Sequence, residues 1–251
     1  MNNSNETGVA AIIQARCGST RHYNKIFEPI GDKPLLWWVV KRLRDAKLVD
    51  HIIIATTVNA PDDAVESFAK SEGLLIARGS EEDVLDRFIN AIKLCPAKTI
   101  VRATGDNPLV DSPTLDLMIS SHLESQADYT SIEGAVPTGS GAEVVSAEAL
   151  ERSWREAKGA QYHEHVTPYI HTNPDKFRIN RIVPPDYMAG KNYRITVDTA
   201  QDLALMRALH DELKERGKPF DFQNAMELLI ERPDIAAINQ DVRQKSWTET
   251  A

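Results

Sequence analysis

The chain has 251 residues, of which 42% are hydrophobic and 26% are charged, and its formal net charge is −8. This composition excludes wholesale disorder, and the length suffices for one large α/β domain with a buried core. The acidic balance argues against the broad basic surface that DNA or RNA would require. If the ligand is an anion, the positive charge must therefore be concentrated locally.

Cysteine content and hydropathy exclude further classes of protein. Two cysteines, Cys17 and Cys95, cannot build a disulfide framework or a structural zinc site. The longest strongly apolar run, Leu35 to Val40, is too short to span a membrane. Residues 1–8 are polar and carry no Lys or Arg, so we expect a polar or disordered tail and no signal peptide. These features predict a cytoplasmic enzyme or binding protein of small-molecule metabolism.

Strands and helices alternate through the first 125 residues. Short apolar runs predict strands, and helical spacing of apolar residues follows each of them. The predicted strands are Val9 to Gln14, His51 to Thr56, Leu74 to Ala77 and Thr99 to Ala103, and the helices follow Pro34, Pro61, Ser80 and Ser112. A capping box formed by Ser80 and Asp83 precedes the third helix. This order predicts an α/β fold: a Rossmann-like, doubly wound, mostly parallel sheet with helices on both faces.

The second half is less regular. Extended pieces are predicted at 129–132, 143–145, 177–183 and 193–197, and helices at 147–157, 162–171, 199–216 and 222–231. Thr199 and Asp202 form a capping box at the third of these helices. The glycine-containing stretch 134–141 predicts a mobile loop. Because no long linker separates the halves, we expect a single domain over residues 9–251, with a first half at 9–125 and a second at 126–251.

The loop after the first predicted strand concentrates positive charge. It reads Gln14-Ala15-Arg16-Cys17-Gly18-Ser19-Thr20-Arg21 and continues to Lys25. Ligands of open α/β sheets bind beyond the carboxyl ends of the strands, where this loop lies. Backbone amides near Gly18, two hydroxyls and three cations suit a polyphosphate. An ordinary solvated basic loop is the alternative interpretation.

The usual phosphate-binding fingerprints are absent from the sequence. A P-loop motif does not occur, and the first strand is not followed by G-x-G-x-x-G. Gly139-Ser140-Gly141 also fails as such a motif, because Val144 occupies the third glycine position. These absences argue against a P-loop NTPase and against a dinucleotide-dependent oxidoreductase.

Two aspartates follow later predicted strands. Asp106, in the turn Thr104-Gly105-Asp106-Asn107-Pro108, enters the same crevice as the basic loop. A carboxylate beside a phosphate-binding loop is typical of Mg²⁺ sites, although a plain turn residue is the alternative. Asp198 ends the extended piece 193–197 at the start of the Thr199 helix. From its local chemistry alone, Asp198 is better explained as a helix cap than as a metal ligand.

Six segments resemble, in order, the cytidylyltransferase family that activates acidic sugars. That family includes the 3-deoxy-manno-octulosonate and acylneuraminate enzymes and, closest in pattern, the spore-coat polysaccharide SpsF-like group. The segments are IIQARCGSTRHYNK (Ile12 to Lys25), RGSEEDVLDRF (Arg78 to Phe88), VRATGDNPLVD (Val101 to Asp111), EHVTPYI (Glu164 to Ile170), RITVDTAQDL (Arg194 to Leu203) and PDIAAIN (Pro233 to Asn239). They extend across nearly the whole chain.

The resemblance implies an activity and a set of site residues. CMP would pass from CTP to an anionic sugar, a ulosonic or sialic-type acid, with Mg²⁺ as cofactor and pyrophosphate as the second product. The implied nucleotide-binding residues are Gln14, Ala15, Arg16, Gly18, Ser19, Arg21, Lys25, Arg78, Ser80 and Thr104. Asp106 and Asp198 match the metal-binding aspartates, and Arg16 and Lys25 would stabilise the leaving pyrophosphate. The resemblance also implies a nucleotide-diphospho-sugar transferase type of fold and a homodimer.

The acceptor would bind to the second half of the chain. Candidate residues are Arg102, Glu143, Tyr162 and His165, among which Arg102 or a protonated histidine would bind an acidic group. Each of them has an alternative role in packing or capping. A phosphonate or another small anionic molecule is the alternative acceptor, and a non-catalytic nucleotide-binding module is the alternative function.

The phosphate loop departs from the family pattern at one place. His22-Tyr23-Asn24 stands where the family commonly has Leu-Pro-Gly, while Lys25 is retained. We therefore expect the turn of this loop to be built differently. Because the proposed chemistry needs no protein nucleophile, Cys17 is interpreted as a small loop residue.

Overall fold

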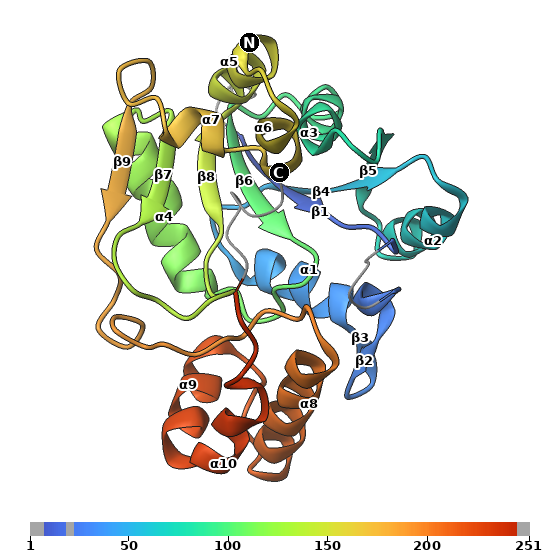
Figure 1. The fold of residues 1–251 in the computed structure, drawn as a ribbon, viewed down its shortest axis with the longest axis vertical. Helices are drawn as coiled ribbons and strands as arrows, with labels where there is room; N and C mark the ends of the chain where they lie inside the picture. The colour runs from blue at the N-terminus through green and yellow to red at the C-terminus, as the bar shows by residue number, and fades with distance from the viewer. Residues whose placement is uncertain (1–7, 19–22, 245–251) are drawn as a thin grey trace, which may run out of the picture.

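The computed structural model of the chain describes residues 8–18 and 23–244. Seven strands form its main sheet: β1 (Val9–Gln14), β4 (His51–Thr57), β5 (Leu75–Gly79), β6 (Thr99–Thr104), β7 (Tyr129–Ile132), β8 (Glu143–Ser146) and β9 (Ile179–Ile182). Their order across the sheet is β5-β4-β1-β6-β8-β7-β9 (Figure 1). β8 is antiparallel to its neighbours β6 and β7, and the other adjacent pairs are parallel. The predicted doubly wound, mostly parallel sheet is confirmed.

Helices and short turns complete the fold. The helices are α1 (Leu35–Asp45), α2 (Asp63–Ser71), α3 (Val84–Ile92), α4 (Ser112–Ser125), α5 (Ala147–Glu156), α6 (Ala160–His165), α7 (Pro168–His171), α8 (Ala200–Glu215), α9 (Phe222–Glu231) and α10 (Pro233–Ala236). The 3₁₀ turns are η1 (Lys25–Phe27), η2 (Ala60–Asp62) and η3 (Ala237–Asn239), and the hairpin is β2 (Pro29–Ile30) with β3 (Lys33–Pro34). Among the helices of the described ranges, none has both the length and the apolar character that crossing a membrane requires.

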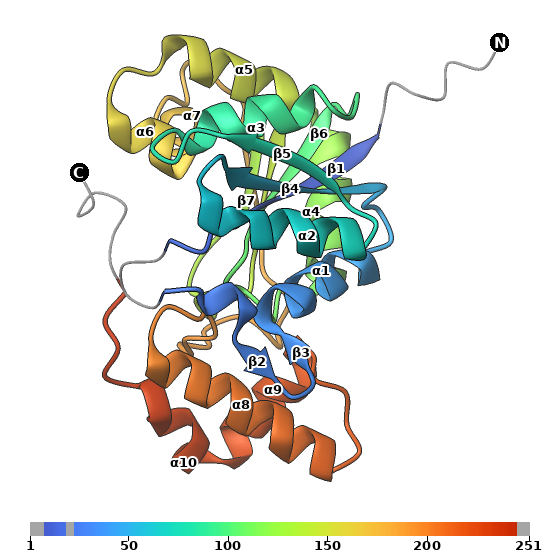
Figure 2. The same cartoon turned by 90° about the vertical axis from the view of Figure 1, so that its right-hand side faces the viewer.

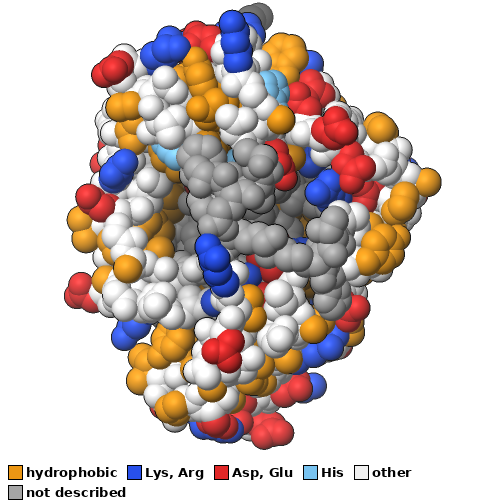
Figure 3. Space-filling view, in the orientation of Figure 1, with side chains coloured by type: hydrophobic (Ala, Val, Ile, Leu, Met, Phe, Trp, Pro, Cys, Tyr) orange, Lys and Arg blue, Asp and Glu red, His pale blue; other side chains and the backbone are white. Residues whose placement is uncertain are grey.

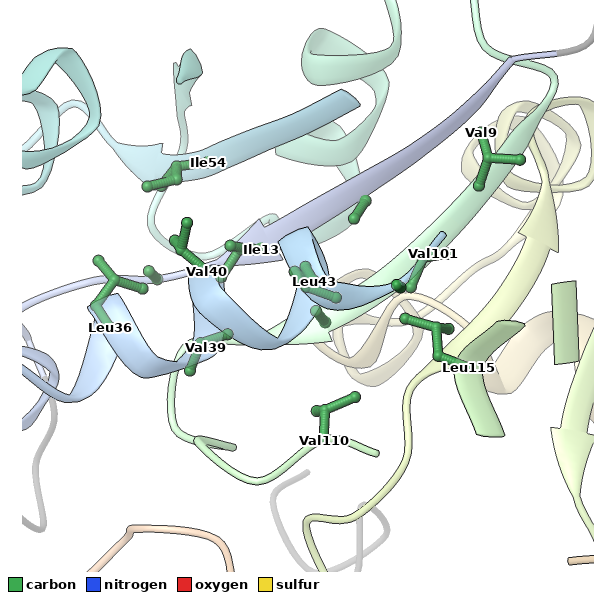
Figure 4. Close-up of a cluster of buried hydrophobic side chains, with 14 of the residues drawn as sticks. Val9, Ile13, Leu36, Val39, Val40, Leu43, Ile54, Val101, Val110 and Leu115 are labelled. Atoms are coloured by element: carbon green, nitrogen blue, oxygen red, sulfur yellow. The ribbon is translucent and has the colours of Figure 1, made fainter. Parts of the chain in front are cut away.

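The alternation of side chains along β1 builds the two main layers of the core. Ala11 and Ile13 join one cluster with residues of α1, α2 and α4, whereas Ala10 and Ile12 join another with residues of α3, α5 and α7. Figure 4 shows the first cluster, in which Ile13 lies beside Val40 of α1. Burying an isoleucine of this kind contributes roughly 2 kcal/mol to folding. Helices therefore cover both faces of the sheet.

A third cluster of buried side chains lies beyond one end of the sheet. Helices α8, α9 and α10 gather there beside the β2–β3 hairpin (Figures 1 and 2). Ile30 of the hairpin and Leu35 of α1 are fully buried in this cluster with Met206 and Phe222. Trp38 packs against the cluster and donates from Nε1 to the carbonyl of Ile30 at 3.0 Å. The C-terminal helices are thus attached to the segment that follows the basic loop.

Residues 193–197 form no strand of the main sheet, so this sequence prediction was wrong. Their backbone pairs with two loops instead. Ile195 N–H donates to the carbonyl of Thr138 at 2.8 Å, and Val197 N–H donates to the carbonyl of Asp106 at 2.9 Å. A single parallel bridge joins Thr138 to Arg194. The two loops take the hydrogen bonds that neighbouring strands would otherwise provide, and the segment comes to lie beside Asp106.

The single helix predicted over 162–171 is interrupted. Val166 has a φ of 73°, and Thr167 N–H donates to the carbonyl of His165 at 2.9 Å, which ends α6. A buried β-branched residue at positive φ is strained. Pro168 starts α7 and has no N–H with which to continue the helical hydrogen bonds. Two short helices therefore replace one.

The capping box predicted at Ser80 is also wrong. The N-cap of α3 is Asp83, which accepts a hydrogen bond from Asp86 N–H at 2.7 Å. Ser80 Oγ accepts from the N–H of Glu82 and of Asp83 at 3.2 and 3.3 Å, in the turn before the helix. Arg87 donates to the Ser80 carbonyl and holds that turn outside the helix.

His122 on α4 gives the stability of the fold a pH dependence. Its side chain is 3% exposed, and Nδ1 pairs with Thr130 Oγ1 on β7 at 3.0 Å. Burial lowers the pKa of His122 from 6.5 to about 4. Below pH 6.5 the unfolded chain takes up a proton that the folded protein resists down to about pH 4. The contribution of neutral, buried His122 to the free energy of unfolding is therefore fully present above pH 6.5 and is lost as the pH falls toward 4.

We expect the variant His122→Gln to lose this pH dependence. Between pH 6.5 and 4 the free energy of unfolding of the wild type should fall by roughly 3 kcal/mol more than that of the variant. Urea denaturation at half-unit steps of pH measures the difference. If the free energy of unfolding changed with pH in the same way in both proteins, His122 would not be the group that causes the pH dependence.

Candidate active site

The carboxyl ends of β1, β4, β5 and β6 lie along one edge of the sheet. The winding of the chain reverses between β1 and β6, and a ligand crevice is expected beyond such a reversal. Gly105 N–H donates to the carbonyl of Gln14 at 2.9 Å. A Cβ at Gly105 would lie 3.0 Å from that of Ala15, so glycine permits this close approach. Gln14 pairs with Thr104 across the two strands.

Lys25 joins two aspartates that are distant in sequence. Its Nζ donates to Asp106 Oδ2 at 2.8 Å and to Asp198 Oδ1 at 2.9 Å. Both Lys25 and Asp198 are 8% exposed. Burial by itself would lower the pKa of Lys25, but the two carboxylates outweigh this effect and hold the pKa above its ordinary value. The structure thus brings together the loop lysine and both predicted metal ligands.

The turn before Lys25 contains asparagine where the family commonly has glycine. Asn24 has a φ of 60°, in the left-handed region that glycine favours and asparagine tolerates. Its N–H donates to the carbonyl of Cys17 at 2.9 Å, which closes the loop. Residue 24 therefore has a backbone that glycine would also adopt, and Lys25 follows in η1. His22, Ser19 and Arg21 lie outside the described residues, so their predicted roles stay predictions.

Arg194 holds the second oxygen of Asp198. Its guanidinium donates to Asp198 Oδ2 at 2.6 Å and to Asp202 Oδ1 at 2.9 Å. Asp202 is fully buried and also accepts from the N–H of Thr199 at 3.0 Å, which completes the predicted capping box. Asn239 donates to both Asp202 and the Arg194 carbonyl, at 2.8 and 3.0 Å. Helix α8 and turn η3 together fix the position of Asp198.

Sequence reasoning overlooked Arg194 as part of the site. The available signal was an arginine directly before the β-branched run Ile195-Thr196-Val197, four residues before Asp198. Asp202, four residues after Asp198, was interpreted only as a helix cap. The structure gives Asp202 a second role, because it orients the guanidinium that contacts Asp198.

The donor set of Asp106 and Asp198 fits a hard divalent cation such as Mg²⁺. This ion takes oxygen ligands, usually one or two carboxylates together with substrate phosphates and water. Asp106 Oδ2 and Asp198 Oδ1 contact the same ammonium nitrogen, so both could coordinate a single cation. Clusters of three or more His, Cys, Asp or Glu suited to a metal do not occur in the part of the chain that the structure describes. The protein would therefore hold the ion with these two carboxylates, and phosphates and water would complete its coordination.

Arg16 lies on the loop after β1 and is partly exposed. Its guanidinium donates to Glu81 Oε1 at 2.8 Å, and its side chain is 39% exposed. A Cβ at Gly18 would have only an ordinary contact with Glu81 at 3.5 Å, so the fold itself does not require glycine there. Arg16 and Lys25 thus differ in setting, since one is a surface cation and the other is buried.

Cys17 is a packing residue, as predicted. Its side chain is 2% exposed, and its N–H donates to Asp62 Oδ1 at 2.7 Å. Burial, with the Asp62 carboxylate adding to it, raises the pKa of Cys17 to about 12. A thiol that stays protonated is not a nucleophile.

Arg78 is bound by protein acceptors. Its guanidinium donates to the carbonyl of Thr57 at 2.9 Å and to the carboxylates of Asp63 and Glu66 at 2.7 and 2.6 Å. These bonds fix the end of β5 to the start of α2. Its predicted nucleotide contact, like that of Ser80, stays a prediction.

Arg87 lies in the segment Arg78 to Phe88, which resembles the family, but it had no predicted role. It is only 2% exposed. It donates to the carbonyls of Ser80 and Glu81 and so holds the turn that presents Glu81 to Arg16. Burial, and then the charge of Arg16, lower the pKa of Arg87 to about 10, so it stays charged at neutral pH.

Two of the predicted acceptor residues form an ion pair. Arg102 donates to Glu143 Oε2 at 2.5 Å across the β6–β8 pairing. Glu143 also accepts from Tyr129 and from Thr167, the latter at 2.9 and 3.1 Å. Burial would raise the pKa of Glu143, but Arg102 and the hydroxyl donors outweigh it and lower that pKa. Arg102 is thus already neutralised by a carboxylate.

The other two acceptor candidates lie on the same side of the sheet. Tyr162 packs edge-on against Tyr169, with ring centroids 5.6 Å apart, beside the second core cluster. Burial, the largest effect, lowers the pKa of His165, and the charge of Arg102 acts in the same direction. His165 therefore resists protonation, which weakens the expectation that it binds an acid as a cation.

Charge on the face of the molecule drawn in Figure 3 is mixed. In Figure 3 the Lys and Arg side chains of the described residues stand among acidic ones over this face. The positive charge placed at the site comes from individual groups, above all Lys25 and Arg194, which are buried with their carboxylate partners.

Comparisons with known proteins identify the family of the chain. A sequence model of the family described as cytidylyltransferase matches residues 10–232. The chain is 39% identical to the spore coat polysaccharide biosynthesis protein SpsF of Bacillus subtilis over 230 residues, which cover 90% of this chain and 95% of that protein.

Solved structures show the same fold. A cytidylyltransferase from Leptospira borgpetersenii superimposes with a TM-score of 0.85 at 30% identity, covering 95% of this chain and all of that one. The CMP:2-keto-3-deoxy-manno-octonic acid synthetase, solved with CTP, gives a TM-score of 0.63 at 17% identity over 82% of this chain and 99% of that one.

Gly139 holds the segment of Asp198 in place through a close approach. Its φ is +95°, and a Cβ there would lie 2.7 Å from the backbone nitrogen of Thr196. Gly190 also has a positive φ, of +69°, but a Cβ there would meet nothing within 4 Å. An alanine at Gly190 would therefore meet only the strain of a positive φ, whereas an alanine at Gly139 would meet this strain and a steric clash as well.

We expect Gly139→Ala to lower the free energy of unfolding by about 3 kcal/mol, because it adds a clash to backbone strain. The matched control Gly190→Ala should cost about 1 kcal/mol, from strain alone. Guanidinium denaturation of both variants provides the measurement. Equal losses would mean that the approach of Gly139 to Thr196 does not constrain the site.

Proposed function

Because this chain belongs to the cytidylyltransferase family and is a nucleotidyltransferase, we propose that it transfers CMP from CTP to an anionic sugar of the ulosonic or sialic-acid type. The observation that carries the proposal is the contact of Lys25 with Asp106 and Asp198, at the carboxyl ends of β1 and β6. It combines a cation for phosphates with a carboxylate pair for Mg²⁺. The relative named for spore coat polysaccharide biosynthesis supports a role in making a surface glycan.

CTP is proposed as the nucleotide from the family and from a structural neighbour. The solved synthetase of the same fold is a complex with CTP. In this chain, the backbone at the ends of β1 and β6 would border the nucleotide near Gln14, Ala15 and Thr104. The partly exposed Arg16 would bind the β- and γ-phosphates of CTP.

The reaction would be an in-line displacement at the α-phosphorus. An acceptor hydroxyl oxygen forms the new bond to phosphorus, the bond to the β-phosphate oxygen breaks, and the hydroxyl proton is released to water. Such a reaction needs positioning and charge stabilisation more than covalent help from the protein. Mg²⁺, held by Asp106 and Asp198, would neutralise phosphate charge. Lys25 and Arg16 would stabilise the leaving pyrophosphate.

The group formed by Glu143 and its partners Arg102, Tyr129 and Thr167 would suit an acceptor sugar with hydroxyl groups. Glu143 is held by Arg102, Tyr129 and Thr167, and its carboxylate can accept from sugar hydroxyls. A phosphonate or another small anionic polyol is the second candidate for the acceptor. A homodimer and a cytoplasmic location also remain proposals.

A screen for pyrophosphate release tests the proposed function. The purified protein is assayed with Mg²⁺ and each of the four nucleoside triphosphates, crossed with a panel of acidic sugars, neutral polyols and phosphonates. Release with CTP and an acidic sugar is the expected result. Release only with another nucleotide, or with none, would contradict the proposal.

With the acceptor identified, Asp106→Asn should lower pyrophosphate release by at least about 10²-fold, because one metal carboxylate is lost. The variant should keep the wild-type circular dichroism spectrum, since asparagine still accepts from Lys25. The control is Asp211→Asn on α8, whose side chain is 70% exposed, and it should retain full activity. Wild-type turnover by Asp106→Asn would remove Asp106 from the site.

A further inference from the structure

We infer that Lys25 competes with the divalent cation for Asp106 and Asp198, so that the metal enters together with the nucleotide triphosphate and not before it. This inference rests on the proposed function, because it takes the two aspartates as metal ligands. It adds an order of binding, which is set by a side chain of the protein.

The Lys25 ammonium and the metal need the same carboxylate oxygens. Lys25 Nζ lies 2.8 Å from Asp106 Oδ2 and 2.9 Å from Asp198 Oδ1. A bound Mg²⁺ would lie about 2.1 Å from its oxygens, so both cations cannot occupy this position at once. A divalent ion placed beside the buried ammonium would also be repelled by it. The metal therefore binds both aspartates only after Lys25 has moved away.

Asp198 cannot turn to offer the metal its other oxygen. Its Oδ2 accepts from Arg194 at 2.6 Å, and the side chain of Arg194 is only 9% exposed. Arg194 is itself bound to Asp202, whose side chain is fully buried. Since Asp202 accepts the N–H of Asp198 as well, the whole group is fixed. Lys25 begins η1 and has a long flexible side chain, so it is the partner that can leave.

The displaced lysine needs a new anionic partner. Lys25 is 8% exposed, and a buried ammonium that loses its carboxylates without gaining another anion is strongly destabilised. A triphosphate beyond the ends of β1 and β6 provides that anion. Nucleotide binding therefore stabilises the displaced lysine at the same time as it brings phosphate ligands for the metal. The affinities for metal and for triphosphate become mutually dependent, each raising the other.

Binding of Mn²⁺ to the protein without nucleotide tests this competition. Electron paramagnetic resonance of free Mn²⁺ gives the dissociation constant for the wild type and for Lys25→Met. We expect the methionine variant to bind Mn²⁺ more tightly, by on the order of tenfold, because the competing charge is gone. Lys25→Arg keeps the charge and should stay close to the wild type. The control Lys70→Met, at a side chain that is 69% exposed, should not change the constant.

Equal or weaker Mn²⁺ binding by a folded Lys25→Met protein would overturn the competition, and so would an absence of binding in both proteins. Lys25→Gln, whose amide is uncharged, serves as the second variant and should show the same gain if methionine prevents folding. The second measurement adds a CTP analogue with a methylene group between the α- and β-phosphates. Its enhancement of Mn²⁺ binding should be smaller in Lys25→Met than in the wild type, and an equal enhancement would also overturn the competition.

These outcomes separate the inference from the proposed function. Mn²⁺ binding needs neither acceptor nor turnover, so unchanged binding by Lys25→Met would refute the competition and leave CMP transfer standing. Conversely, tighter binding by the variant would support the competition even if the pyrophosphate screen found no substrate.

Discussion

The contact of Lys25 with Asp106 and Asp198 is the interaction on which the arrangement of this site depends. It joins a loop after β1, a turn after β6 and the start of α8. Each participant is held by a different part of the fold: Lys25 by η1, Asp106 by the close approach at Gly105, and Asp198 by Arg194 and Asp202. Because charged groups are costly to bury alone, these three segments must assemble together.

Local patterns predicted much of the fold. The strand Val9–Gln14 and the helix Phe222–Glu231 have the predicted bounds, because alternation and helical spacing of apolar residues are local properties. The prediction failed where partners distant in sequence decide the structure. The segment 193–197 has the composition of a strand, but its hydrogen bonds go to Thr138 and Asp106. Valine at 166 likewise gives no local sign of a positive φ, since tertiary packing imposes it.

The candidate site shows the same division. Lys25, Asp106 and Asp198 were recognisable from residue types at strand ends and from the family pattern, and the structure places them in contact. Arg194 was not recognised, because its importance depends on a carboxylate that the helix α8 brings to it. The pairing of Arg102 with Glu143 was equally invisible in the sequence, since β8 runs antiparallel to β6 and sets their register.

The distance in sequence between Lys25 and Asp198, 173 residues, has a consequence for the order in which the protein becomes functional. Contacts between such remote segments form late, after local structure. During synthesis, the first half of the chain emerges with Lys25 and Asp106 but without Asp198, Arg194 or Asp202. A nascent or truncated chain of that kind has no complete carboxylate pair. The proposed competence to hold a metal with a triphosphate would therefore arise only when the C-terminal helices have docked.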